Sequence, residues 1–151
     1  VDYGPDENKT EDEVMLRLGQ VYAAKEGKNP AEMSEDALVS MGKHVLDLWN
    51  EKALVPEGWK VSPEDCIHAW MKFGEKVFKN FHGENVMVVS SNGIIRFAPY
   101  LTGDFNAFVK EHDIKVTTGG VCVFEREDNE ENWRCIEWNV KPKKYFESLS
   151  A

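Results

Sequence analysis

The chain has 151 residues, of which 42% are hydrophobic and 30% charged, and its formal net charge is -9 at pH 7. This length and apolar content predict one folded domain over residues 1–151 and exclude disorder for most of the chain. Lys and Arg number 18 against 27 Asp and Glu, which argues against nucleic acid or an anionic membrane as the main partner, because both require a basic surface.

The first half of the sequence predicts three helices. The first begins at Thr10, whose spacing to Glu13 is that of a capping box. The second begins near Ser34, and the third begins at Ser62, where Pro63 suits the first helical position. The apolar residues at helical spacing in these three segments are Val14, Leu18, Val21 and Tyr22; Leu38, Met41, Val45 and Leu48; and Ile67, Trp70, Met71, Gly74, Val77, Phe78 and Phe81.

The second half of the sequence predicts strands. Residues 86–90 form a continuous apolar run, typical of a parallel strand that is covered on both faces. Residues 115–118 and 121–125 are two further predicted strands, and residues 133–139 alternate as an antiparallel edge strand. Helices are also predicted for residues 93–101 and 142–149. The chain is therefore expected to be an α/β domain.

A polar turn, Ser90-Ser91-Asn92-Gly93, joins the apolar run to the next predicted helix. Such a junction in an α/β protein is a common place for an anion, because the main-chain N–H groups that open a helix point outward there. The Ser91 hydroxyl and the Asn92 amide add neutral hydrogen-bond donors. The alternative is that Asn92 only caps the helix that begins at Gly93.

Three segments, taken in order, resemble the histidine phosphatase superfamily, the phosphoglycerate mutase-like proteins. VMVVSSNGIIR resembles the family's VVSHGGVIR strand, turn and helix. In this match Ser91 stands at the position of the second active-site histidine. Asn92 and Gly93 stand at the two glycines, and Arg96 stands at the helix arginine. VDYGPDENKTEDE is similar to the family's Tyr-Gly segment, and KVTTGGVCVFE resembles the strand that comes after the histidine. The resemblance implies a three-layer α/β/α fold with a mostly parallel sheet.

The resemblance also implies a function, namely action on phosphate monoesters as a phosphatase or phosphomutase. Ser91 would stand at the catalytic position, and the phosphate would be held by Ser91, Asn92, Gly93 and Thr118. The family's Arg-His-Gly strand is not in this sequence, and its catalytic acid would lie just before Val1, so the domain is expected to be incomplete at its N-terminus. An unpaired edge is then expected beside residues 86–90. The alternative function is a catalytically degenerate module that binds a phosphorylated ligand or a protein.

The remaining expectations concern cofactors, partners and location. No cofactor and no metal site are expected, because no histidine pairs with another His or Cys at metal-binding spacing. His112 is the candidate to replace the missing imidazole. The partner is expected to be a phosphorylated small molecule, with no nucleic acid and no membrane. The cysteines are odd in number and lack Cys-x-x-Cys spacing, which predicts reduced thiols in a cytoplasmic protein: Cys66, Cys122 and Cys135.

Overall fold

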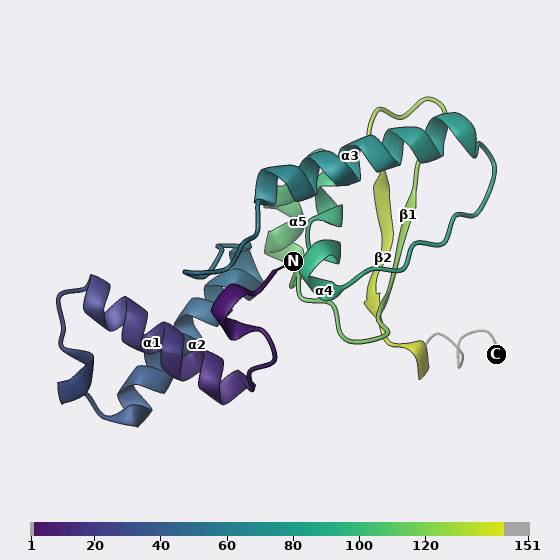
Figure 1. Cartoon of the computed structure of the whole chain (residues 1–151). Coiled ribbons are helices and arrows are strands. Elements are labelled where there is room, and N and C mark those ends of the chain that lie inside the picture. The colour runs from purple at the N-terminus through teal and green to yellow at the C-terminus, as the bar shows by residue number, and fades with distance from the viewer. Residues whose placement is uncertain (1, 144–151) are drawn as a thin grey trace. The chain divides into compact units, whose positions relative to one another are not determined.

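The computed structural model describes residues 2–143 and divides into two compact units, Val1–Val61 and Ser62–Ala151, each described here by itself (Figure 1). The expectation of one domain stays a prediction. No helix among the described residues is long and apolar enough to span a membrane. The α-helices are α1 (Glu11–Lys25), α2 (Glu35–Lys52), α3 (Pro63–Asn80), α4 (Asn92–Ile95) and α5 (Phe105–Glu111); the strands are β1 (Val121–Glu125) and β2 (Arg134–Val140); and short 3₁₀ helices span Gly4–Asp6, Pro30–Glu32 and Ala98–Thr102.

The three long helices begin where the sequence predicts, because their first turns are capped by local side chains. The Thr10 hydroxyl accepts the Glu13 N–H while the Glu13 carboxylate accepts the Thr10 N–H, which completes the capping box of α1. Ser34 and Ser62 cap α2 and α3 in the simpler way, through one hydroxyl each. These predictions are confirmed.

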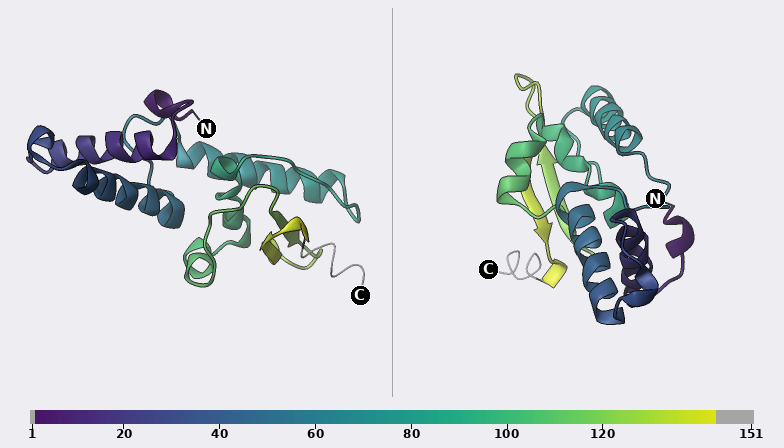
Figure 2. Two further views of the ribbon diagram at one scale, coloured as in Figure 1. Left: turned by 90° about the horizontal axis from the view of Figure 1, so that it is seen from below. Right: turned by 90° about the vertical axis from the view of Figure 1, so that its left-hand side faces the viewer.

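In the first unit, α1 and α2 lie side by side, as both views of Figure 2 show, and approach closely at two glycines. A Cβ placed on Gly19 would lie 1.8 Å from the Leu38 carbonyl oxygen, and one on Gly42 would lie 1.7 Å from the Met15 carbonyl oxygen. Both obstacles are backbone atoms, so no side-chain rotation relieves them. The helix pair therefore requires glycine at both contacts.

A buried carboxylate ties the start of the chain to this helix pair. Both Asp6 oxygens accept hydrogen bonds from the Arg17 guanidinium, and Asp6 Oδ2 also accepts one from Trp59 Nε1 at 2.7 Å. The Trp59 ring packs edge-on against Tyr3 and Trp49, with ring centres 4.7 and 5.5 Å apart. Asp6 thus joins the Tyr-Gly segment to both helices.

In the second unit, the hydrophobic core lies around the 3₁₀ helix Ala98–Thr102. Its buried residues include Phe97, Leu101, Phe108, Ile114 and Val116. Helix α3 packs on this 3₁₀ helix, and Gly74 lets it approach Leu101 and the Trp133 indole closely. The hairpin joins the same core, because the main-chain N–H of Trp133 donates to the main-chain carbonyl of Leu101 at 3.0 Å.

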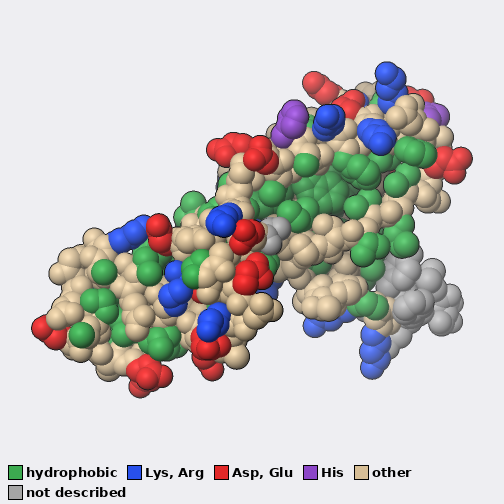
Figure 3. Space-filling view, viewed as in Figure 1, with side chains coloured by type: hydrophobic (Ala, Val, Ile, Leu, Met, Phe, Trp, Pro, Cys, Tyr) green, Lys and Arg blue, Asp and Glu red, His purple; other side chains and the backbone are tan. Residues whose placement is uncertain are grey.

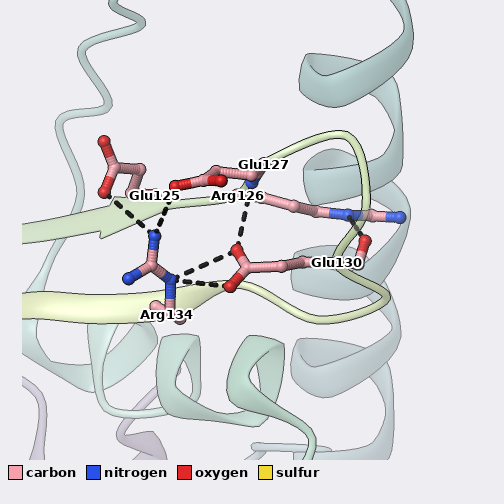
Figure 4. Close-up of polar contacts among 5 residues, drawn as sticks. All are labelled: Glu125, Arg126, Glu127, Glu130 and Arg134. Carbon is pink, nitrogen blue, oxygen red and sulfur yellow. Dashed lines mark hydrogen bonds and ion pairs between the residues drawn. The ribbon is translucent and has the colours of Figure 1, made fainter.

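The tip of the β1–β2 hairpin is held by charged side chains (Figure 4). Arg134 forms ion pairs with Glu125, Glu127 and Glu130, across and along the turn. Arg126 lies over the Phe78 ring of α3, 4.0 Å from its centre, and its Nη1 pairs with a glutamate of the same helix. The acidic residues of this loop therefore hold the hairpin tip through Arg134, and Arg126 attaches the hairpin to α3.

The expected three-layer α/β/α fold with a mostly parallel sheet is wrong. The described residues are mostly helical and contain one antiparallel two-stranded sheet, β1–β2. Residues 86–90, expected as a central covered strand, are exposed and pair with no strand of the described part. The apolar run could not decide this, because the partners of a strand come from distant parts of a chain. Residues 86–90 belong to no sheet, so the unpaired sheet edge expected beside them is not found among the described residues.

Other elements differ from the predictions in smaller ways. The predicted strands 121–125 and 133–139 are confirmed as β1 and β2. Residues 115–118 form no strand and end in a turn. The single helix predicted for residues 93–101 is two short ones, α4 and the 3₁₀ helix that contains Pro99, because proline has no N–H to continue the ladder. Helix α5 was not predicted, and the helix expected at 142–149 lies mostly outside the described residues.

Candidate functional site

The candidate site is built on the turn between residues 86–90 and α4. Ser91 is the N-cap residue of α4 and is exposed, and its hydroxyl makes no hydrogen bond within residues 2–143. Gly93 is buried in the first turn of the helix, which begins at Asn92 and not at Gly93. The Ser91 hydroxyl is therefore available to a ligand.

Asn92 does not cap α4. Its Oδ1 accepts the main-chain N–H of Val116 at 2.9 Å, 24 residues further along the chain. Val116 is only 4% exposed, so this bond satisfies a donor that water does not reach well. Asn92 thus fastens the Ser91 turn to the segment 115–118, and its side-chain NH₂ makes no hydrogen bond to any described residue.

Asn139 also holds this segment, and the sequence analysis missed it. Its Oδ1 accepts the Thr117 N–H at 2.8 Å and the Thr117 hydroxyl at 2.9 Å, while its Nδ2 donates to the Lys115 carbonyl at 3.2 Å. Asn139 has a φ of 54°, in the left-handed region that asparagine tolerates better than most residues. An asparagine at the end of a predicted strand was the available signal.

Thr118, the fourth predicted site residue, lies in the turn that follows. The Gly120 N–H donates to the Thr117 carbonyl at 2.8 Å, and Gly119 has a φ of 73°, which a side chain would strain. Thr118 is exposed and its hydroxyl makes no hydrogen bond within the described range. The Asn92–Val116 bond brings the two turns into one region, although no contact joins Thr118 to Ser91.

No described group is placed to activate Ser91. His112, the candidate base, is the C-cap residue of α5, and its ring packs on the Phe108 ring with centres 4.6 Å apart. It makes no hydrogen bond to Ser91. His82 is engaged elsewhere, 3.3 Å from Asp128. The arrangement holds hydrogen-bond donors but not a nucleophile paired with a base.

Arg96, which the resemblance places at the family's helix arginine, points into the protein. The residue is 1% exposed, and its Nε donates to the Asn92 carbonyl at 3.4 Å. In this structure it supports α4 from within. Lys115 is the exposed cation of the segment that Asn92 and Asn139 hold.

The thiols are protonated at neutral pH. Burial raises the pKa of Cys66 and of Cys122, and burial together with the neighbouring Cys122 raises the pKa of Cys135 to about 11. All three cysteines are free. Among residues 2–143, no group of three or more His, Cys, Asp or Glu side chains is arranged to hold a metal ion.

The first unit contains an open hollow of about 310 Å³, beside α1 and α2. It is lined by Tyr22, Glu26, Lys28, Ser40, Met41, His44 and Val45, and its charged members Glu26 and Lys28 pair with each other at 2.6 Å. No predicted site residue lines this hollow. Its charges are already matched, so it offers little to a charged ligand.

The second unit thus combines short and long helices with one β-hairpin. Asn92 and Asn139 fix its two polar turns, at Ser91 and Thr118, through hydrogen bonds to residues 115–117. No family model matches the chain, and no curated protein or solved structure shows significant similarity to it.

Proposed function

We propose that this chain binds a phosphate monoester at the Ser91 turn and the neighbouring turn of Thr118, and that it does not hydrolyse the ester by itself. The resemblance to the histidine phosphatase superfamily supports the ligand class, since it assigns both turns to one phosphate site. The three-layer architecture of that family is no part of the proposal. The ligand would be a phosphorylated small molecule.

The observation that carries the proposal is the 2.9 Å hydrogen bond between Asn92 Oδ1 and the Val116 N–H. It joins two segments 24 residues apart that the resemblance treats as neighbours. Between them they offer the hydroxyls of Ser91 and Thr118 and the amide NH₂ of Asn92, and residues 91–93 and 115–119 contain no carboxylate that would repel an anion. Lys115 adds a positive charge in the same segment.

Weak binding is expected. A hydrogen bond to a charged group contributes about 1.5–3 kcal/mol, and much of that gain is offset by the freedom that the ligand loses. A Kd of about 1 mM corresponds to about 4 kcal/mol, which is the strength that a few neutral donors and one exposed lysine support. Turnover is not expected, because Ser91 has no hydrogen-bonded base among the described residues.

The proposal is tested with two measurements on the whole chain. Broadening of the ³¹P signal of phenyl phosphate reports binding, and release of p-nitrophenol from p-nitrophenyl phosphate reports hydrolysis. We expect saturable binding that Ser91→Ala and Thr118→Val each weaken several-fold, with hydrolysis equal to that in buffer. Ser40→Ala, at an exposed serine of α2, is the matched control and should bind as the parent chain does.

Two results would contradict the proposal. If Ser91→Ala and Ser40→Ala had the same affinity as the parent chain, the site would lie elsewhere or not exist. If the chain released p-nitrophenol and Ser91→Ala abolished that release, Ser91 would be a nucleophile and the protein an enzyme.

The cytoplasm is the location that we propose for this activity. The three cysteines are free, and a reducing compartment keeps thiols in that state. The excess of acidic residues supports a small-molecule ligand over nucleic acid or an anionic membrane surface.

A further inference from the structure

Residues 86–89 form an exposed apolar segment that pairs with no strand among residues 2–143. The residue exposures alternate along it: Met87 and Val89 are 88% and 85% exposed, whereas Val86 and Val88 are 40% and 45% exposed. This period of two is that of a β-strand with one half-covered face. From residue 85 to residue 90, no backbone N–H or C=O takes part in a hydrogen bond to another described residue.

Helix α3 adds to this apolar surface. Its apolar stripe is the most regular in the sequence, yet Gly74 is its one buried residue, and Met71 remains exposed, as does Phe81 just beyond the helix. Figure 3 shows hydrophobic side chains gathered beside α3 on the face of this unit that it presents. Contiguous apolar surface next to free strand hydrogen-bonding groups marks a site for strand addition.

The charge pattern restricts the strand that fits there. Residues 85–95 include no ionisable side chain, although 30% of the chain is charged. The strands β1 and β2 carry charges at Glu125, Arg134 and Glu137, and pairing with either would place a charge on an apolar neighbour. Residues 86–90 themselves bring only apolar and hydroxyl side chains. We infer that this segment pairs with the same segment of a second copy of the chain, forming an antiparallel dimer.

One register of this pairing satisfies both faces. With Val88 on the two-fold axis, Met87 lies opposite Val89 of the second copy, so the two most exposed residues of each strand cover each other. Val86 then lies opposite Ser90 on the half-covered face, which continues the apolar surface beside α3. Pairing about a two-fold axis uses the same edge of both segments, so this interface joins two copies.

The dimer has an expected dependence on salt. Each copy has a net charge of -9, so the copies repel each other at low ionic strength, whereas the paired strands carry no charge. Added sodium chloride should therefore strengthen the dimer. An interface made of ion pairs would weaken under the same conditions.

The test is the mass of the whole chain in solution, measured by light scattering and by sedimentation equilibrium. The monomer has a mass of 17.3 kDa, and we expect a dimer of twice that mass at tens of micromolar. The double variant Met87→Lys with Val89→Lys should be monomeric with an unchanged circular dichroism spectrum. Leu54→Lys, at a residue that is 53% exposed in the other unit, should leave the dimer intact.

The register has its own test. Val88→Cys lies on the two-fold axis and should form a disulfide-linked dimer with oxidised glutathione as the oxidant, whereas the parent chain, with its three free cysteines, should not. A monomeric parent chain at 100 µM would overturn the inference, as would dissociation by Leu54→Lys or a dimer that survives the Met87 and Val89 substitutions. Open-ended aggregates in place of a dimer would overturn the closed two-fold pairing.

Discussion

Asn92 offers the sharpest perturbation of the candidate site, because two substitutions separate its structural bond from its role toward a ligand. Asn92→Ala removes the Oδ1 that accepts the Val116 N–H at 2.9 Å, and Val116 is buried. A buried donor left without an acceptor costs about 1–3 kcal/mol. Asn92→Asp keeps an oxygen acceptor of the same size and position, so this bond survives.

We expect Asn92→Ala to lower the free energy of unfolding by about 2 kcal/mol, within the range for an orphaned buried donor. For a unit of this size, that loss corresponds to a fall in Tm of about 8–16 °C. Asn92→Asp should unfold within a few degrees of the parent chain but bind phenyl phosphate much more weakly, because the new carboxylate repels the anion. Denaturant unfolding followed by tryptophan fluorescence, with phosphate binding measured on the same samples, checks both effects.

The reasoning would be refuted if Asn92→Ala unfolded as the parent chain does, since the bond to Val116 would then contribute nothing. It would also be refuted if Asn92→Asp lost as much stability as Asn92→Ala, because the acceptor oxygen would not be the group that matters. Asn92→Asp with full phosphate affinity would remove Asn92 from the proposed site.

Three further predictions concern the rest of the chain. Gly19→Ala and Gly42→Ala should each destabilise the helix pair by about 2 kcal/mol. Overpacking against backbone costs about 3 kcal/mol, and the higher helix propensity of alanine offsets about 1 kcal/mol of that cost. Equal or higher stability in chemical denaturation would contradict the close approach. Asp6→Ala should cost about 3 kcal/mol, since it leaves the partly buried Arg17 guanidinium without its carboxylate. The same denaturation experiment on Arg17→Met should show a loss at least as large, because the Asp6 side chain is only 2% exposed and would keep a buried charge without its cation; a clearly smaller loss would contradict this. Cys135 should react with iodoacetamide slowly at pH 8 and faster as the pH rises toward 11, because the thiolate forms only near its pKa of about 11. Mass spectrometry of labelled peptides gives the rate, and a rate that levels off near pH 8 would contradict this.

The parts of the fold that the sequence predicts correctly are those with local causes. Thr10, Ser34 and Ser62 start helices because a hydroxyl satisfies an N–H within the next three residues, and this needs no distant partner. The alternation in β1 and β2 likewise reports a hairpin whose two strands are close in sequence. Helix α5 was missed although Asp104 caps it by the same local rule, with its carboxylate accepting the Ala107 N–H at 2.9 Å.

The parts that the sequence misjudges depend on distant partners. An apolar run such as residues 86–90 indicates a strand whose side chains are stable only when other elements bury them. It does not reveal whether the described residues provide those elements. Asn92 illustrates the same limit within the candidate site. Local rules assign it to helix capping, whereas its acceptor oxygen serves Val116, and Asn139 serves Thr117 in the same way. The position of Asn139 at a strand end was a signal, but neither asparagine's partner can be identified from sequence spacing.

The most direct test of the central claim is a titration of the ¹⁵N-labelled chain with phenyl phosphate, followed by amide chemical shifts. The proposal predicts saturable shifts at the amides of Asn92, Gly93 and Thr118 with one common Kd near 1 mM, and no comparable shift in α1 or α2. It also predicts that Asn92→Asp abolishes these shifts while the rest of its spectrum stays as in the parent chain. Shifts that do not saturate, or that spread evenly over both units, would contradict a phosphate site at the Ser91 turn.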